Sequence, residues 1–157
     1  MANSDSEPPL VRPPDSFIDP EAVRKPNLYD RIGGRPVVEA VIDRLYTAIE
    51  ADPTLRSLFP DDLAPGRLHQ QWFFEEWLGG ERRYTARRGS PRLGQRHQPF
   101  AITLQAATRW LGHMQKALDD AGVETADLQS IMQGLQPLAT HFVNAEGSDP
   151  GRNTRAP

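Results

Sequence analysis

The sequence places one histidine in a short, tightly bounded segment. Glycines and prolines at positions 89, 91, 94 and 99 leave room for only one or two helical turns around His97. Pro99 disfavours the helical conformation at Gln98, so a helix that carries His97 should end at or just after it. The imidazole would then lie in the last turn of a short helix, with Phe100 and Ile102 close behind it in the chain.

A single imidazole on a short, well-terminated helix beside apolar residues is the arrangement that axial ligation of haem iron requires. A lone histidine that merely packs near a loop is the commoner case, so His97 by itself leaves both interpretations open. The chain contains no cysteine, which excludes disulfides, thiolate catalysis and thiolate metal sites. The strong protein ligands that remain for a metal are four histidines and the carboxylates.

Three further residues with polar groups fall on apolar faces of predicted helices. Tyr46 lies near the edge of such a face and is also compatible with an ordinary core-edge tyrosine. Gln70 shares a face with large aromatic residues, which is costly unless its amide finds a partner or lies at the rim in water. Trp110 is flanked by small residues that leave space beside it, although plain core packing would also explain it.

Arginines are frequent just before the His97 segment. Residues 81–92 contain Tyr84 together with Arg82, Arg83, Arg87, Arg88 and Arg92. Basic runs of this kind are usually solvated surface. Because these arginines flank His97, they are also candidates to pair with the carboxylates of a ligand.

The elements that would position these side chains are all helical. Apolar periodicity and helix-breaking residues predict helices near 28–32, 36–51, 65–78, 104–121 and 125–144, with a short helix or turn after Asp52. Pro137 should kink the last helix or disrupt one of its turns. No strand alternation, internal repeat or glycine-rich phosphate loop is found, so the sequence predicts an all-α fold.

Composition sets the limits of this interpretation. The 157 residues fit one domain, which we expect over residues 28–144, between disordered tails at 1–27, which is rich in proline, and 145–157. A net charge of -3 and a pI of about 5.8 give no basic surface for nucleic acid. With no apolar run of the ~18–20 residues that a membrane span needs and no signal peptide, we expect a cytoplasmic protein without membrane attachment.

Several short motifs together resemble those of the truncated haemoglobins of the second group, which are shortened globins with a two-over-two helical sandwich. The resemblance extends from about Leu28 to Asn144, and its most specific part is Arg-His-x-Pro-Phe-x-Ile at 96–102 followed by a downstream tryptophan. Its other marks are Gly33-Gly34, Leu45-Tyr46, Leu58-Phe59-Pro60, Gly79-Gly80, Tyr84, Arg88-Gly89, Pro91-Arg92-Leu93, Trp110-Leu111 and Met114.

This resemblance implies a two-over-two sandwich that encloses haem b, with its iron held by His97. It implies that Tyr46, Gln70 and Trp110 donate hydrogen bonds to a ligand on the iron. Gly66 falls where ordinary globins carry a gating histidine. The residues expected to contact the macrocycle or its propionates are Phe59, Phe73, Tyr84, Arg92, Leu93, Arg96, Phe100, Ile102 and Met114.

The function that the resemblance implies is the binding of a diatomic gas. Oxygen is the favoured ligand, with nitric oxide, carbon monoxide or peroxide as others. A slow-releasing polar pocket favours redox detoxification of peroxide or nitric oxide over oxygen delivery, and it would need an electron-donating reductase. A haem-based sensor that signals through a partner protein is the alternative, and a helical interaction module without a cofactor is a third. We expect a monomer or a homodimer.

Overall fold

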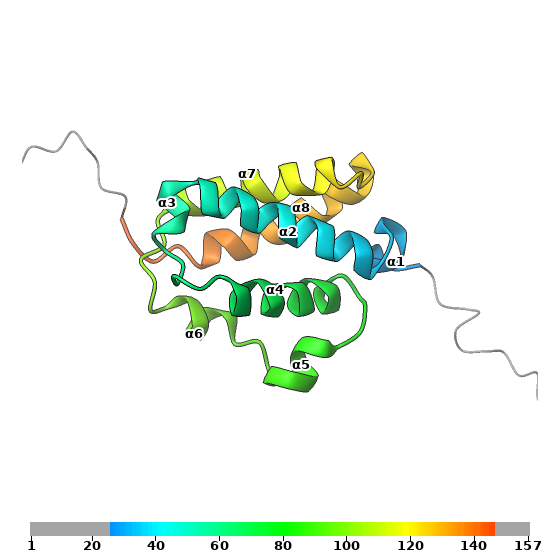
Figure 1. Cartoon of the computed structure of the whole chain (residues 1–157), viewed down its shortest axis with the longest axis horizontal. Coiled ribbons are helices and arrows are strands. Elements are labelled where there is room, and N and C mark those ends of the chain that lie inside the picture. Colours follow the sequence, from blue (N-terminus) through cyan, green and yellow to red (C-terminus); the bar gives the residue numbers. More distant parts are fainter. Residues whose placement is uncertain (1–25, 147–157) are drawn as a thin grey trace, which may run out of the picture.

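The computed structural model describes residues 26–146, which form eight helices and contain no strand. The helices are α1 (Leu28–Ile32), α2 (Arg35–Ala51), α3 (Pro53–Arg56), α4 (Ala64–Trp77), α5 (Arg83–Arg88), α6 (Leu93–His97), α7 (Leu104–Asp120) and α8 (Thr125–His141). Helix α7 packs on α8 and on α2, and α2 packs in turn on α4. In Figure 1, α5 and α6 lie on the side of α4 that faces away from α2.

The predicted helices agree with these bounds to within about a turn, and two prolines act differently from the simplest expectation. Helix α8 continues through Pro137, so this proline does not end the helix. Proline has no N–H, so Pro137 cannot donate to the carbonyl of Gln133 four residues before it. Both residues lie on the exposed face of the helix, where water can solvate that carbonyl. Gln98 has helical dihedral angles (φ -55°, ψ -38°) although a proline follows it. It lies in a turn that the Phe100 N–H closes by donating to the His97 carbonyl.

The predicted tails lie mostly outside the described residues, which exclude 1–25 and 147–157. Asn27 falls within the predicted N-terminal tail but belongs to the fold. Its side chain accepts from Asp30 N–H to cap α1 and donates to the Gly79 carbonyl at 2.7 Å. At the other end, Ala145 N–H donates to the Ile102 carbonyl at 3.1 Å.

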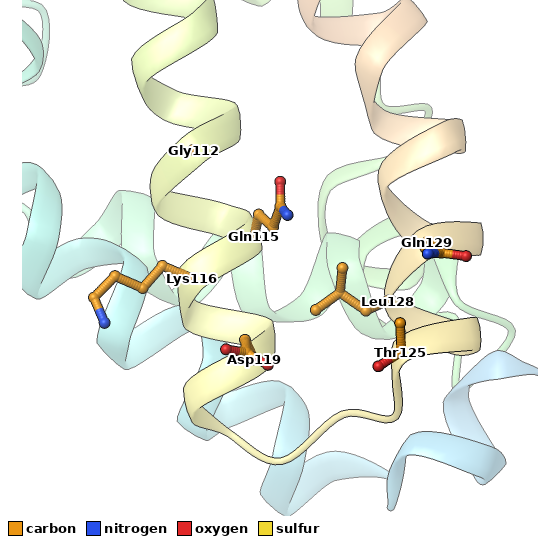
Figure 2. Close-up of a pocket in the computed structure, with 7 residues that line it drawn as sticks. All are labelled: Gly112, Gln115, Lys116, Asp119, Thr125, Leu128 and Gln129. Atoms are coloured by element: carbon orange, nitrogen blue, oxygen red, sulfur yellow. The ribbon is translucent and has the colours of Figure 1, made fainter.

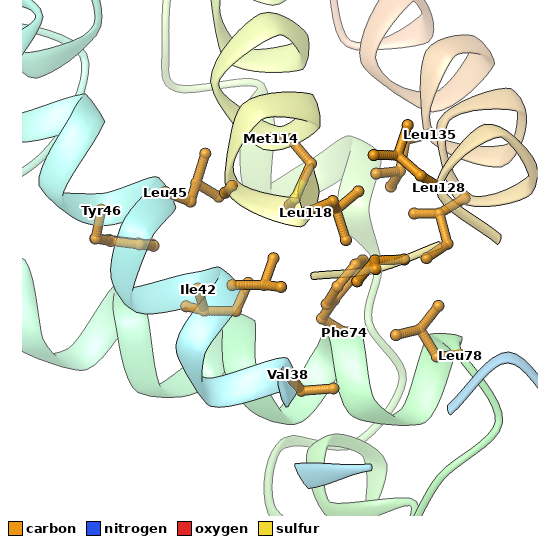
Figure 3. Packing of buried hydrophobic residues seen from close by; sticks show 14 of the residues in the cluster. Val38, Ile42, Leu45, Tyr46, Phe74, Leu78, Met114, Leu118, Leu128 and Leu135 are labelled. Atoms are coloured by element: carbon orange, nitrogen blue, oxygen red, sulfur yellow. The ribbon is translucent and has the colours of Figure 1, made fainter. Parts of the chain in front are cut away.

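One hydrophobic core joins the four long helices. Ile42 and Leu45 of α2 and Met114 and Leu118 of α7 are fully buried in it, and Figure 3 shows them gathered with Phe74 of α4. Each such side chain contributes about 1.5–3 kcal/mol through burial. The core therefore fixes how α2, α4 and α7 cross, and it buries the apolar helix faces that the sequence predicted.

A buried carboxylate holds the shorter helices to this core. Glu75 of α4 is 1% exposed, and its two oxygens accept from Arg83 Nη2 at 2.8 Å, from Arg35 Nη2 at 3.2 Å and from the Tyr29 hydroxyl at 3.1 Å. These bonds connect α4 to α1, α2 and α5. Burial, followed by the bond to Glu75, raises the pKa of Tyr29. Helix α5, which carries Tyr84, is thus fixed by charge as well as by packing.

We predict that Glu75→Gln lowers the free energy of unfolding by about 2 kcal/mol, because two guanidinium groups lose their charged acceptor while water still reaches part of each. Urea unfolding followed by far-UV circular dichroism measures the change. Glu81→Gln removes the exposed partner of Arg35 and should cost less than about 0.5 kcal/mol. Equal effects of the two substitutions would show that the buried network does not stabilise the fold.

Candidate functional site

An apolar cavity of about 370 Å³ lies among helices α2 to α8. Five of the six residues predicted as apolar haem contacts line it, namely Phe59, Phe73, Leu93, Phe100 and Ile102. Met114, the sixth, does not line it and is fully buried in the helical core. The reason is that the cavity ends at the turn of α7 that carries Trp110, and the next turn already packs against α2 and α8.

His97 lines this cavity from the last residue of α6, the position that the sequence predicted. Its Nδ1 lies 2.6 Å from the Leu93 carbonyl oxygen, which can only accept, so Nδ1 carries the proton and donates. In the neutral imidazole this leaves the lone pair on the other nitrogen, Nε2, for which no hydrogen-bond partner is found within residues 26–146. A neutral imidazole fixed in this way is what iron ligation requires.

Phe142 completes the support of His97 and was missed as a site residue. Its ring stacks on the imidazole, with centroids 4.1 Å apart and planes 4° from parallel. Just beyond it, Asn144 Nδ2 donates to the Phe100 carbonyl at 2.8 Å, and Asn144 Oδ1 accepts from Ile102 N–H at 2.8 Å. The only signal in the sequence was that Phe142 continued the apolar stripe of the last helix.

Three hydrogen-bond donors from three helices line the same cavity: Tyr46 of α2, Gln70 of α4 and Trp110 of α7. Tyr46 is only 5% exposed, its ring meets that of Phe59 edge-on at 6.0 Å, and burial raises the pKa of its hydroxyl to about 12. Within residues 26–146 none of the three donor groups has a hydrogen-bond partner. Among the described residues every fully buried side-chain nitrogen or oxygen has a partner, so the three donor groups are open to the cavity and suit a ligand that accepts.

Helix α4 presents the face that the sequence predicted. Gly66, Gln70 and Phe73 all line the cavity, and a Cβ at Gly66 would lie 3.3 Å from the Tyr46 hydroxyl oxygen. The sequence left Phe73 and Phe74 as alternatives, and the structure places Phe74 in the core instead. Trp77 stacks on Phe74 and lies outside the cavity. The absence of a side chain at Gly66 therefore keeps space open beside Tyr46.

Polar groups collect at the α5–α6 side of the cavity. Tyr84 and Arg96 line it, and the Arg96 guanidinium lies 5.7 Å from the Tyr84 ring centroid while its Nε donates to the Pro91 carbonyl. Arg92, predicted with them, does not line the cavity. It precedes α6 as an exposed residue in a left-handed conformation with φ 43°.

His69 is a cavity residue that the sequence gave no reason to select. Its Nε2 lies 3.1 Å from Arg88 Nη1, and because arginine only donates, this nitrogen accepts. Burial, and then the charges of Arg88 and Arg96, lower the pKa of His69. Arg96 lines the cavity, and Arg88 reaches its edge through the contact with His69.

A second carboxylate positions the elements around Trp110. Asp52 caps α3 by accepting from Thr54 N–H at 3.1 Å, and its Oδ2 accepts from Arg109 Nε and His113 Nε2, both at 2.8 Å. These bonds tie α3, which carries the cavity residue Leu55, to α7 on either side of Trp110. The Arg109 bond, with that of His113, holds the pKa of Asp52 well below its usual range.

A second hollow, of about 410 Å³, lies on the surface between α7 and α8 (Figure 2). It is lined mostly by polar residues such as Gln115, Asp119 and Gln129, and it includes none of the predicted site residues. Its larger volume reflects an open surface, so we assign the site to the apolar cavity.

An all-helical sandwich around an apolar cavity, with one imidazole oriented into it, is the arrangement of a globin that binds haem iron. The family model of bacterial-like globins matches residues 27–144, and the chain belongs to this family. No helix among residues 26–146 has both the length and the apolar character to cross a bilayer.

Solved structures narrow the assignment within the family. The hemoglobin of Chloroflexus aurantiacus is 41% identical, with a TM-score of 0.74, covering 76% of this chain and 99% of its own. The group II truncated hemoglobin of Bacillus anthracis is 34% identical, with a TM-score of 0.78, covering 81% and 98%. A truncated oxygen-avid haemoglobin of Bacillus subtilis is 34% identical, with a TM-score of 0.72, covering 76% and 100%.

The chain is thus a truncated haemoglobin of the second group, with the predicted two-over-two sandwich. It binds haem with its iron, and as a globin it binds diatomic gases such as oxygen. The predicted all-α fold and cofactor are confirmed. The interaction module without a cofactor, the third hypothesis, is wrong.

We predict that Asp52→Asn keeps the cap of α3 but lowers stability at neutral pH, since Asn caps well and lacks the charge that Arg109 and His113 face. A depressed pKa means that this stabilisation is present above about pH 4 and is lost as the pH falls toward the folded-state pKa. Urea midpoints at pH 7, 4.5 and 3.5 should therefore fall more steeply for the wild type than for Asp52→Asn. Asp120→Asn, which removes the exposed partner of Lys116, is the control. Parallel pH profiles for Asp52→Asn and the wild type would contradict the prediction.

Proposed function

We propose that His97 holds the haem iron and that Tyr46, Gln70 and Trp110 together retain oxygen in the cavity. The observation that carries this proposal is a set of three donor groups that line one cavity from three helices and have no hydrogen-bond partner within residues 26–146. Haem iron, when bound, would supply the site at which the gas binds and the negative charge that the gas acquires. The protein supplies the donors that stabilise that charge.

The donor groups are suited to slow release. A pKa raised to about 12 keeps the Tyr46 hydroxyl protonated at physiological pH, so it remains a donor. A hydrogen bond to a charged acceptor contributes about 1.5–3 kcal/mol, which corresponds to roughly 10- to 150-fold in a rate constant. The oxygen avidity of the Bacillus subtilis relative supports the same interpretation.

A gas that is released slowly is poorly suited to delivery, so we propose a redox role in the detoxification of peroxide or nitric oxide. Tyr46 and Trp110 line the cavity and are oxidisable side chains that can supply electrons locally. Repeated turnover also needs an external electron donor, so we include a reductase partner in the proposal. The walls of the cavity favour neither substrate over the other.

The proposed ligand to iron makes a direct prediction. His97→Ala should abolish the five-coordinate ferrous haem spectrum, because the neutral Nε2 is lost. His69→Ala, His113→Ala and His141→Ala should retain that spectrum, and His69→Ala is the closest control because His69 also lines the cavity. Absorption and resonance Raman spectra of the ferrous proteins measure the effect. An unchanged spectrum for His97→Ala would exclude His97 as the ligand.

The donor network predicts that Trp110→Phe, which keeps much of the ring volume, accelerates oxygen release by roughly 10- to 150-fold. Tyr46→Phe should have an effect of the same sign. Because both donors act on one acceptor, the double variant should depart from the sum of the two changes. Stopped-flow measurement of oxygen dissociation from the ferrous protein tests both points, with carbon monoxide, a weaker acceptor, as the comparison. Additive effects would argue that the two residues do not share a ligand.

A further inference from the structure

Positive charge is concentrated in one stretch of this acidic chain. Residues 82–118 contain no Asp or Glu but hold 8 of the 18 lysines and arginines, although the net charge of the whole chain is -3. Six of the eight are arginines from position 82, just before α5, to position 96 in α6. These two helices follow one another along the outer side of α4 in Figure 1.

Two of the six arginines are used by the fold. Arg82 pairs with Glu76 and Arg83 with Glu75. The other four have no carboxylate partner within residues 26–146. Arg96 lines the cavity, which leaves Arg87, Arg88 and Arg92, three exposed residues that we call the arginine patch.

The arginine patch adjoins the cavity through α4. The Arg87 guanidinium lies 4.9 Å from the ring centroid of Trp72, and Arg88 Nη1 lies 3.1 Å from His69 Nε2. His69 lines the cavity, and its ring lies against that of Trp72 with centroids 5.6 Å apart. A protein seated on the patch would therefore be separated from the cavity by these two aromatic side chains.

We propose that the arginine patch is the docking surface for an acidic one-electron donor protein that reduces the haem iron. This rests on the proposed redox function, which needs an electron source. In the step, the donor is oxidised by one electron and ferric iron is reduced by one, and no bond is made or broken. The charge is complementary, since guanidinium groups pair with carboxylates in a bidentate manner, and Arg and Trp are enriched at protein interfaces.

The surroundings of the patch fit a protein better than a lipid surface. The Trp72 ring is only partly exposed and is covered by the Arg87 guanidinium, so it offers no free apolar anchor. Helix α5 has six residues, whereas interfacial helices need an extended apolar face. Exposed arginines that face water are instead suited to steering an acidic partner over distances of about the Debye length.

The test uses the haem-loaded full chain in its ferric form and a reduced plant-type [2Fe–2S] ferredoxin, an acidic one-electron donor, as the probe. Stopped-flow absorbance gives the second-order rate constant of reduction at several salt concentrations. Arg87→Gln and Arg92→Gly each remove one patch charge. Glycine adopts the left-handed conformation of residue 92 readily, so the second variant should not strain the fold. The matched control is Arg44→Gln, an exposed arginine of α2 whose charge acts on Lys116 and Asp120 of α7.

We expect each patch variant to lower the rate constant about two- to fivefold at low salt and to weaken its salt dependence, while Arg44→Gln changes neither. Reduction by photoreduced lumiflavin, a small neutral donor, should be unchanged in Arg87→Gln, as should its carbon monoxide association. Wild-type rates in both patch variants, or an equal loss in Arg44→Gln, would overturn the docking proposal. So would patch-dependent sedimentation with phosphatidylglycerol vesicles alongside wild-type ferredoxin rates, which would assign the patch to a membrane.

The two proposals fail differently. The docking proposal alone is contradicted if oxygen release is slow and lumiflavin reduction is normal, but ferredoxin reduction does not depend on the patch. The proposed function is contradicted if oxygen release is fast and Trp110→Phe does not accelerate it, whatever the ferredoxin kinetics.

Discussion

The hydrogen bond from His97 Nδ1 to the Leu93 carbonyl is the interaction on which the site depends, because it leaves the other imidazole nitrogen available to iron. That bond lies inside α6, a helix of five residues. A helix this short isn't stable alone, so contacts from elsewhere must hold it. They come from the end of α8, where Phe142 stacks on the imidazole and Asn144 bonds to the Phe100 carbonyl. The chemistry of His97 thus depends on residues more than forty positions away.

The imidazole of His97 is held by hydrogen bonds and stacking, whereas Tyr46, Gln70 and Trp110 have no hydrogen-bond partner within residues 26–146. The helices that carry these three donors are held in place by other residues. Glu75 binds α1, α2 and α5 to α4, and Asp52 binds α3 to α7. Neither carboxylate lines the cavity. Because each is buried and fully engaged, the helices can keep their positions without using Tyr46 or Trp110 as structural hydrogen-bond donors. Stability and ligand binding are thereby assigned to different polar groups.

What the sequence could predict followed from local signals. The apolar stripes located the long helices, and the breakers around His97 located its short helix. Periodicity also put Gly66, Gln70 and Phe73 on the cavity face, although it could not separate Phe73 from Phe74. Met114 lies on the predicted buried face but does not line the cavity, because periodicity identifies a buried face and not how far along that face a cavity extends.

The roles of the two buried carboxylates, Asp52 and Glu75, could not be predicted, because each carboxylate binds residues that are distant in sequence. Asp52 meets Arg109 and His113 only once α3 and α7 are packed, and Glu75 meets Arg35 only across α2 and α4. Nothing local distinguishes these carboxylates from solvated ones. Their burial is a consequence of the tertiary fold.

Gly66 shows how the cavity balances access against retention. A Cβ there would approach the Tyr46 hydroxyl oxygen to 3.3 Å, closer than most such contacts, so even alanine would press on the donor. Glycine therefore leaves the Tyr46 hydroxyl free to turn toward a ligand, and it also leaves no side chain to obstruct the path beside it. With no steric gate at this position, the proposed function assigns the retention of a ligand to hydrogen bonds. The three donors that line the cavity from three helices are suited to that role.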